Sequence, residues 1–178
     1  MKTYKIILAL GVILVVIAGF FLINNMSQHN MGSMGNMQVT SEKDFITQMI
    51  PHHQEAIDTS KIVGEETNNE ELKSLTQAII SAQENEISIM KDILKTKYQT
   101  SGESTMYHNM MGDLTQLSGS ELEKSYLEGM IEHHKGAIEM AKSVENIKLS
   151  PEIKEIVNNI ILSQENEINM MKDMLQKE

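Results

Sequence analysis

The chain contains one unit twice. The segment MIPHHQEAIDTSK returns as MIEHHKGAIEMAK, from Met49 to Met130, and QENEISIMKDIL returns as QENEINMMKDML. Both matches have the same offset of 81 residues, so residues 44–97 and 125–178 are two copies of one unit. Two such copies can face each other about a pseudo-twofold axis. The identical residues include His-His, Met and Glu, and these polar and sulfur side chains need an explanation beyond packing.

The first part of the chain is apolar. Residues 6–23 carry no charge and follow Lys2 and Lys5. Eighteen apolar residues can just span a bilayer as a helix, and the flanking lysines hold the N-terminus in the cytoplasm. We therefore expect segment 1–23 to be an N-terminal transmembrane helix that anchors the domain on the extracytoplasmic face of the plasma membrane. The alternative is a cleaved signal peptide, which would leave a secreted or periplasmic protein.

The rest of the chain divides into a tether and a helical domain. Residues 24–40 are rich in Asn, Gly and Ser, which is typical of a flexible tether. Residues 41–178 predict four helices and no strand. Two hairpins with short turns, joined by a longer connection over residues 98–119, predict an all-α, up-down-up-down four-helix bundle built from a duplicated helical hairpin. The predicted helix starts are Ser41 with Asp44, Asn68 with Glu71, Ser120 with Glu123, and Ser150 before Pro151.

Helical periodicity places the repeated histidines in the bundle core. At 100° per residue, His53 lies in the middle of an apolar stripe, as does His134 in the second copy, while His52 and His133 lie on the flanks. A single core histidine is usually just hydrogen-bonded, but burying four imidazoles without partners is costly. Metal coordination or carboxylate pairing would relieve that cost. The candidate core ligands are Met49, His52, His53, Glu86 and Met90 in the first copy, and Met130, His133, His134, Glu167 and Met171 in the second.

The residue types favour copper as the metal. Di-iron bundles of the ferritin type carry E-x-x-H, whereas this chain carries M-x-x-H at Met49 and again at Met130. A thioether therefore replaces a hard carboxylate, and thioether with imidazole favours copper, above all Cu(I), while Cu(II) is also accepted. Cysteine is absent, which excludes zinc–thiolate and iron–sulfur sites. The net charge of -10 argues against nucleic acid as a partner.

Two further groups of Met and His lie outside the predicted helices. Exposed methionine has no packing role in a flexible segment, so we interpret both groups as thioether collectors for Cu(I). The alternatives are compositional drift and sacrificial methionines that absorb oxidant. The first group is His29, Met31, Met34 and Met37 in the tether, and the second is Met106, His108, Met110 and Met111 in the connection.

The repeated motifs resemble a known bacterial family. MIxHHxxAI, LSGSELEKSYLEGMIEHHKGAIEMAK and QENEI are similar to the family called domain of unknown function 305, over residues 41–178. The resemblance implies a ferritin-like four-helix bundle and an exported copper-binding protein linked to copper resistance. The chain departs from a strict repeat at Glu132, where the first copy has Pro51. The ligands that the resemblance implies are Met49, His52, His53, Met130, His133 and His134.

Three functions remain open at this point. The leading hypothesis is a membrane-tethered, extracytoplasmic protein that buffers, sequesters or hands on copper without turnover and so contributes to copper tolerance. Its expected partners are copper ions, the membrane, and a copper transporter or chaperone. One alternative is a redox enzyme of the ferroxidase or cuprous oxidase kind, although few carboxylates face inward. The other is a metal-free helical interaction or sensor module.

Overall fold

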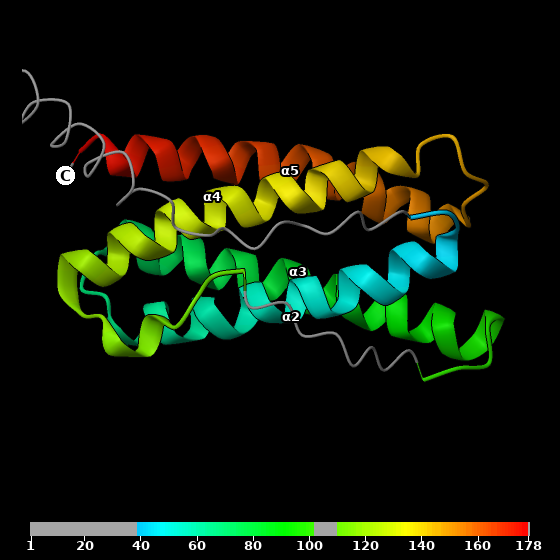
Figure 1. Cartoon of the computed structure of the whole chain (residues 1–178), viewed down its shortest axis with the longest axis horizontal. Helices are drawn as coiled ribbons and strands as arrows, with labels where there is room; N and C mark the ends of the chain where they lie inside the picture. Colours follow the sequence, from blue (N-terminus) through cyan, green and yellow to red (C-terminus); the bar gives the residue numbers. More distant parts are fainter. Residues whose placement is uncertain (1–38, 102–109, 178) are drawn as a thin grey trace, which may run out of the picture. The chain divides into compact units, whose positions relative to one another are not determined.

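The computed structural model describes residues 39–101 and 110–177, which form a bundle of four long helices (Figure 1). No strand occurs among these residues, and this confirms the all-α prediction. None of the helices in this part of the chain is long and apolar enough to cross a membrane. The predicted anchor and nearly all of the tether lie outside the described residues and stay predictions. The elements are α2 (Glu42–Glu66), α3 (Glu70–Lys97), the short 3-10 helix η1 (Leu114–Gln116), α4 (Gly119–Ser143) and α5 (Pro151–Leu175).

Capping side chains explain where α2 and α3 begin. The Oγ of Ser41 accepts the backbone N–H of Asp44 at 3.1 Å, as predicted. The cap of α3 is Asn69 rather than the predicted Asn68, and its side chain accepts two N–H groups of the first turn. Either asparagine has the right chemistry, so only the path of the short turn decides between them. The start of α5 at Pro151 is as predicted, whereas α4 begins after Ser118 and not at the predicted Ser120.

Contacts between helix ends fix the directions of the four helices. Thr67, just after α2, donates from Oγ1 to Oε1 of Glu123 near the start of α4, at 2.5 Å. Lys177, after α5, pairs through Nζ with Oε2 of Glu71 at the start of α3, at 2.9 Å. One end of the bundle therefore holds the starts of both α3 and α4, and these two helices run in the same direction (Figure 1). The order of directions is up-down-down-up.

The predicted up-down-up-down order is therefore wrong, and the length of the connection between α3 and α4 explains why. An extended chain covers about 3.3 Å per residue, whereas a helix of 25 residues, such as α4, is about 38 Å long. Residues 98–118 are thus long enough to lead from the end of α3 back to the opposite end of the bundle. A single long crossover of this kind is typical of ferritin-like folds.

The two hairpins pack as a pseudo-twofold arrangement requires. α2 packs along α3 and α4 along α5, and the hairpins meet mainly through α2 against α4, which run antiparallel. The buried apolar residues form two clusters. His52 and His53 follow Ile50 of the first cluster and precede Ala56 of the second. We call the mutually contacting polar side chains at this level the polar layer: His52, His53, Glu55, Glu86, His133, His134 and Glu167.

Glu42 joins three helix ends at the other end of the bundle. Its carboxylate accepts from Lys97 Nζ at 2.6 Å and from the Tyr98 hydroxyl at 2.9 Å, and also from the backbone N–H of Ser150. The Glu42 side chain is only 2% exposed. Burial alone would raise the pKa of Glu42, but the hydrogen bonds from Lys97, Ser150 and Tyr98 together lower it. The ionised carboxylate therefore stabilises the fold.

We expect Glu42→Gln to lower the free energy of unfolding by roughly 1–3 kcal/mol at neutral pH, because a neutral amide replaces a charged acceptor. The lowered pKa means that this stabilisation is present above the unfolded-state value near 4.5 and is lost as the pH falls below it. Thermal unfolding followed by circular dichroism from neutral to acidic pH should show the two proteins converging. Glu128→Gln, at an exposed ion pair with Lys124, is the control and should change little. A difference that is the same at every pH would contradict this role of Glu42.

Candidate metal centre

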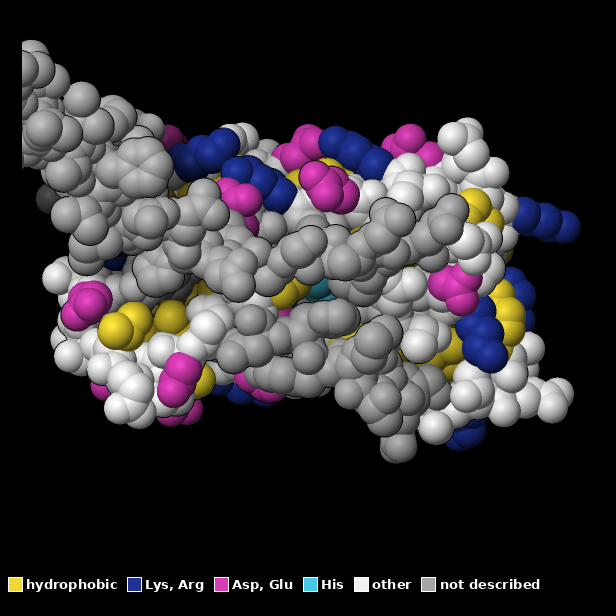
Figure 2. Space-filling view, in the orientation of Figure 1, with side chains coloured by type: hydrophobic (Ala, Val, Ile, Leu, Met, Phe, Trp, Pro, Cys, Tyr) yellow, Lys and Arg dark blue, Asp and Glu magenta, His cyan; other side chains and the backbone are white. Residues whose placement is uncertain are grey.

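Four imidazole rings form a continuous row across the middle of the bundle. The ring centroids of His52 on α2 and His133 on α4 are 3.7 Å apart. The ring of His53 lies next to that of His52, and the ring of His134 next to that of His133, with centroids 6.4 Å apart in both pairs. All four residues are at most 1% exposed, and on the face shown in Figure 2 histidine appears only as a small cyan area. The two hairpins thus bring all four predicted histidines to one pseudo-symmetric site.

The pair that crosses between the hairpins is not the pair at the centre of the helical stripes. If the two apolar stripes faced each other squarely, the central residues His53 and His134 would be the pair that meets. The structure instead stacks His52 on His133, and the other two rings face their own hairpin partners. The contact between α2 and α4 is made by the flanks of these helices, and a helical wheel does not give the direction of the neighbouring helix.

The outer rings of the row are held by carboxylates of the partner helices. His53 Nε2 lies 2.7 Å from Glu86 Oε2, and His134 Nε2 lies 2.7 Å from Glu167 Oε2. With the proton on Nε2, each ring donates to its carboxylate and keeps the lone pair of Nδ1. Neither of these Nδ1 atoms has a hydrogen-bond partner among the described residues. Glu86 and Glu167 therefore each lie within hydrogen-bonding distance of one imidazole. Their predicted role as metal ligands stays a prediction.

The surroundings of His133 lower its pKa. Burial lowers its pKa, the nearby Glu55 raises it, and His134 and His53 lower it again, so that the net pKa lies below the ordinary value. The neutral imidazole is the form that binds a metal. Neither ring nitrogen of His133 has a hydrogen-bond partner among the described residues. Uncompensated nitrogens in a buried ring are a cost that a bound cation would remove.

Glu55 is a site residue that the sequence analysis missed. It is 1% exposed, and its Oε2 lies 3.6 Å from Nε2 of His133. The available signal was its position three residues after His52, which places both side chains on one face of α2. The second copy has Gly136 at the equivalent position, so a search for residues repeated in both copies passes over this carboxylate.

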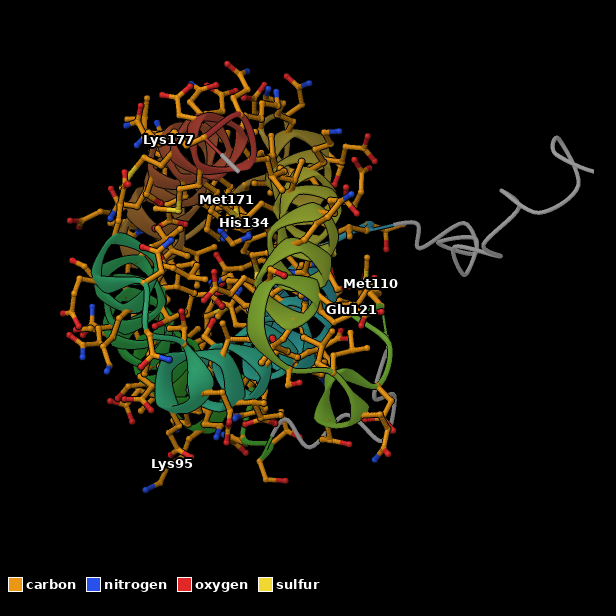
Figure 3. The ribbon with its side chains drawn as sticks, turned by 90° about the vertical axis from the view of Figure 1, so that its left-hand side faces the viewer. Lys95, Met110, Glu121, His134, Met171 and Lys177 are labelled. Atoms are coloured by element: carbon orange, nitrogen blue, oxygen red, sulfur yellow. The ribbon has the colours of Figure 1, made fainter. Side chains whose placement is uncertain are left out.

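Four methionines adjoin the polar layer, two in each apolar cluster. Met49, Met90, Met130 and Met171 are all fully buried. Each lies four residues from a histidine or glutamate of the polar layer, hence one turn away on the same helix face. Figure 3 shows His134 and Met171 inside the bundle, whereas the side chains of Lys95 and Lys177 extend away from it. No group of three or more His, Asp or Glu side chains in the described part of the chain is arranged to hold a metal ion.

Of the predicted ligands in the connection and the tether, the structure describes only Met110 and Met111. Met111 is 6% exposed, and its Sδ would lie 3.2 Å from a Cβ placed on Gly129. Met110 is half-buried and lies at the periphery (Figure 3). The predicted ligands that lie outside the described residues are His29, Met31, Met34, Met37, Met106 and His108.

Solved structures with the same fold are similar to this chain over most of its length. CopM in its Cu(II)-bound form is 33% identical, with a TM-score of 0.71, over 78% of this chain and 97% of CopM. CopM in its Cu(I)-bound form is 31% identical, with a TM-score of 0.70, over 78% of this chain and 98% of that one. A DUF305 fragment from Deinococcus radiodurans is 26% identical, with a TM-score of 0.69, over 79% and 99% of the two chains.

The chain is also similar to a viral protein and matches a family model. Uncharacterized protein L153 of Acanthamoeba polyphaga mimivirus is 49% identical over 53 residues, which are 30% of this chain. The match spans only 35% of the viral protein. The family model described as "Domain of unknown function (DUF305)" matches residues 42–175, which include all four long helices. The chain therefore belongs to the DUF305 family.

Proposed function

We propose that this protein binds copper in its polar layer, with a preference for Cu(I), and buffers, sequesters or hands on the metal without catalytic turnover. The observation that carries the proposal is the row of four buried imidazoles flanked by four buried methionines. Imidazole and thioether are ligands that suit Cu(I), and imidazole also suits Cu(II). CopM, whose structures are 29–33% identical to this chain, is named in Cu(II)-, Cu(I)- and silver-bound forms.

The chain's own residues would divide the work of binding. Glu86 and Glu167 orient the outer rings through Nε2, so that Nδ1 of each ring is the atom left for the metal. The apolar clusters on both sides exclude water, which protects a soft ion from competing oxygen ligands. Bound copper would provide a partner for Nδ1 of His53 and His134 and for the ring nitrogens of His133.

A groove between α3 and α5 offers a route from solvent to the polar layer. Its volume is about 470 Å³, and its lining includes Asn85, Glu86, Glu152 and Glu155. The carboxylate of Glu86 is 11% exposed and lies at hydrogen-bonding distance from the fully buried His53. Negative side chains along the groove attract cations. Under this proposal a copper ion would meet Glu86 first and the imidazole row next.

The cellular setting is part of the proposal. The uncharged segment at residues 6–23 would anchor the protein, or direct its export, so that the bundle works outside the cytoplasm. An extracytoplasmic copper-binding protein of this kind would contribute to copper tolerance by lowering free copper. Its partner would be a transporter or chaperone that gives or takes copper.

We expect the full-length chain, purified in detergent, to bind Cu(I) at least on the order of 100-fold more tightly than Zn(II) or Fe(II), because thioether ligands favour soft ions. Competition with calibrated chelators under anaerobic conditions gives the affinities. Comparable affinity for Fe(II), or none for Cu(I), would be incompatible with the copper assignment.

The close contact between His52 and His133 predicts that variants of these two residues lose Cu(I) affinity non-additively. His52→Gln and His133→Gln should each weaken the same Cu(I)-binding event, because the two ring centroids are only 3.7 Å apart. The double variant should therefore lose little more Cu(I) affinity than either single variant. His53→Gln and His134→Gln belong to different hairpins and should give losses closer to additive. Circular dichroism checks that all variants fold. Additive losses in the stacked pair would place the two rings in separate sites.

The methionines of the tether lead to a separate prediction about the number of Cu(I) ions bound. Replacing Met31, Met34 and Met37 with Leu should lower the number of Cu(I) ions bound per chain, because three thioethers are removed. Helicity and melting temperature should hardly change, since these residues precede α2 and lie outside the bundle helices. Metal analysis after equilibrium dialysis gives the stoichiometry. An unchanged count of copper ions would mean that these methionines do not bind copper.

A further inference from the structure

The two copies of the repeat differ at the place where the connection meets the bundle. The first copy carries Glu55, and the second carries Gly136 at the equivalent position. The first copy likewise carries Gln48 where the second carries Gly129. The side chain of Met111 packs on Gly129 so closely that a Cβ there would meet Sδ and Cε at 3.2 Å. One copy therefore leaves room for the connection, and the other supplies a carboxylate that binds it.

The two oxygens of Glu55 have different partners. Oε1 accepts the backbone N–H of Met111 at 2.9 Å. Oε2 faces Nε2 of His133 at 3.6 Å and has no hydrogen-bond partner among the described residues. Nε2 of His133 has none there either. A carboxylate that served only to hold the connection would be expected to have both buried oxygens hydrogen-bonded.

The distance between these two atoms suits a shared cation better than a hydrogen bond. Hydrogen bonds between N and O are about 2.7–3.2 Å long, so the contact at 3.6 Å is a long one, although it still raises the pKa of His133. Nitrogen and oxygen ligands of tetrahedral zinc, each about 2.0–2.2 Å from the ion, are about 3.3–3.6 Å apart, and the 3.6 Å observed here lies at the upper end of that range. An ion between Nε2 of His133 and Oε2 of Glu55 would satisfy both buried atoms at once.

We propose that Glu55 is a ligand and positioning residue that transmits copper binding at the His52–His133 pair to the segment Met110–Leu117. A metal ion that binds through Oε2 fixes the carboxylate, and the fixed carboxylate holds the Met111 N–H through Oε1. Ligating carboxylates are commonly oriented by such a hydrogen bond on their second oxygen. The segment includes Leu114 of η1, which is 4% exposed and packs in the second apolar cluster, so its attachment extends beyond one hydrogen bond.

This inference rests on the proposed copper binding, and amide hydrogen exchange of the full-length chain tests it separately. Exchange in peptides covering residues 110–117 is measured without metal, with Cu(I) under anaerobic conditions, and with Cu(II), while metal analysis records how much copper is bound. In the wild type, copper should slow exchange in these peptides by a factor on the order of 10. Glu55→Gln keeps an acceptor oxygen for the Met111 N–H but loses the ligand oxygen. It should match the wild type without metal and show no slowing with copper.

Two further variants complete the design. Glu55→Ala removes both functions and should exchange faster than the wild type in every condition. Glu132→Gln is the matched control, because this carboxylate is adjacent to His133 in sequence but is 45% exposed and paired with Lys135; it should respond to copper as the wild type does. If copper binds and the exchange of residues 110–117 is unchanged, or if Glu55→Gln still responds, the role of Glu55 is wrong and copper binding stands. If neither Cu(I) nor Cu(II) binds to the wild type, both proposals are wrong.

Discussion

Buried imidazoles need partners, and this requirement organises the middle of the bundle. A buried polar group left unsatisfied costs about 1–3 kcal/mol. Each hairpin supplies a partner for one of its rings from its own second helix, Glu86 for His53 and Glu167 for His134, both at 2.7 Å. The remaining two rings lie against each other across α2 and α4. The hairpins must therefore meet at the level of the polar layer, and this fixes their register.

The two apolar clusters compensate for the free-energy cost of burying the polar layer and separate it from solvent. Each cluster contains large, fully buried side chains, such as Phe45 and Leu94 in the first and Leu72 and Leu127 in the second. Their burial, at about 25 cal/mol per Å² of apolar surface, offsets the desolvation of the charged and polar groups between them. Inside a low-dielectric layer, satisfied polar contacts also favour one packing over its alternatives. The polar layer thus also helps to define the fold.

Local pattern predicted the helices and the inward direction of the repeated residues, because both depend on spacing within one helix. The direction of α4 was not predictable in this way, since a connection over residues 98–118 is long enough for either topology. The stacking of His52 on His133 depends on how two helices approach each other, which no single helix records. Glu86 and Glu167 were recognised as site residues, but their pairing with imidazoles only became visible with the hairpin geometry.

The two copies of the repeat have the same contacts within each hairpin but differ where they meet the connection. The hairpin pairs have the same distance in both copies, and so do the rings of adjacent histidines. Each of these contacts lies within one repeat, so each copy can satisfy it alone. Glu55 and Gly136 lie where the repeats meet the connection, and the chain has only one connection. A single segment cannot be bound equally by two symmetric positions, and this is the physical reason for the sequence difference between the copies at this point.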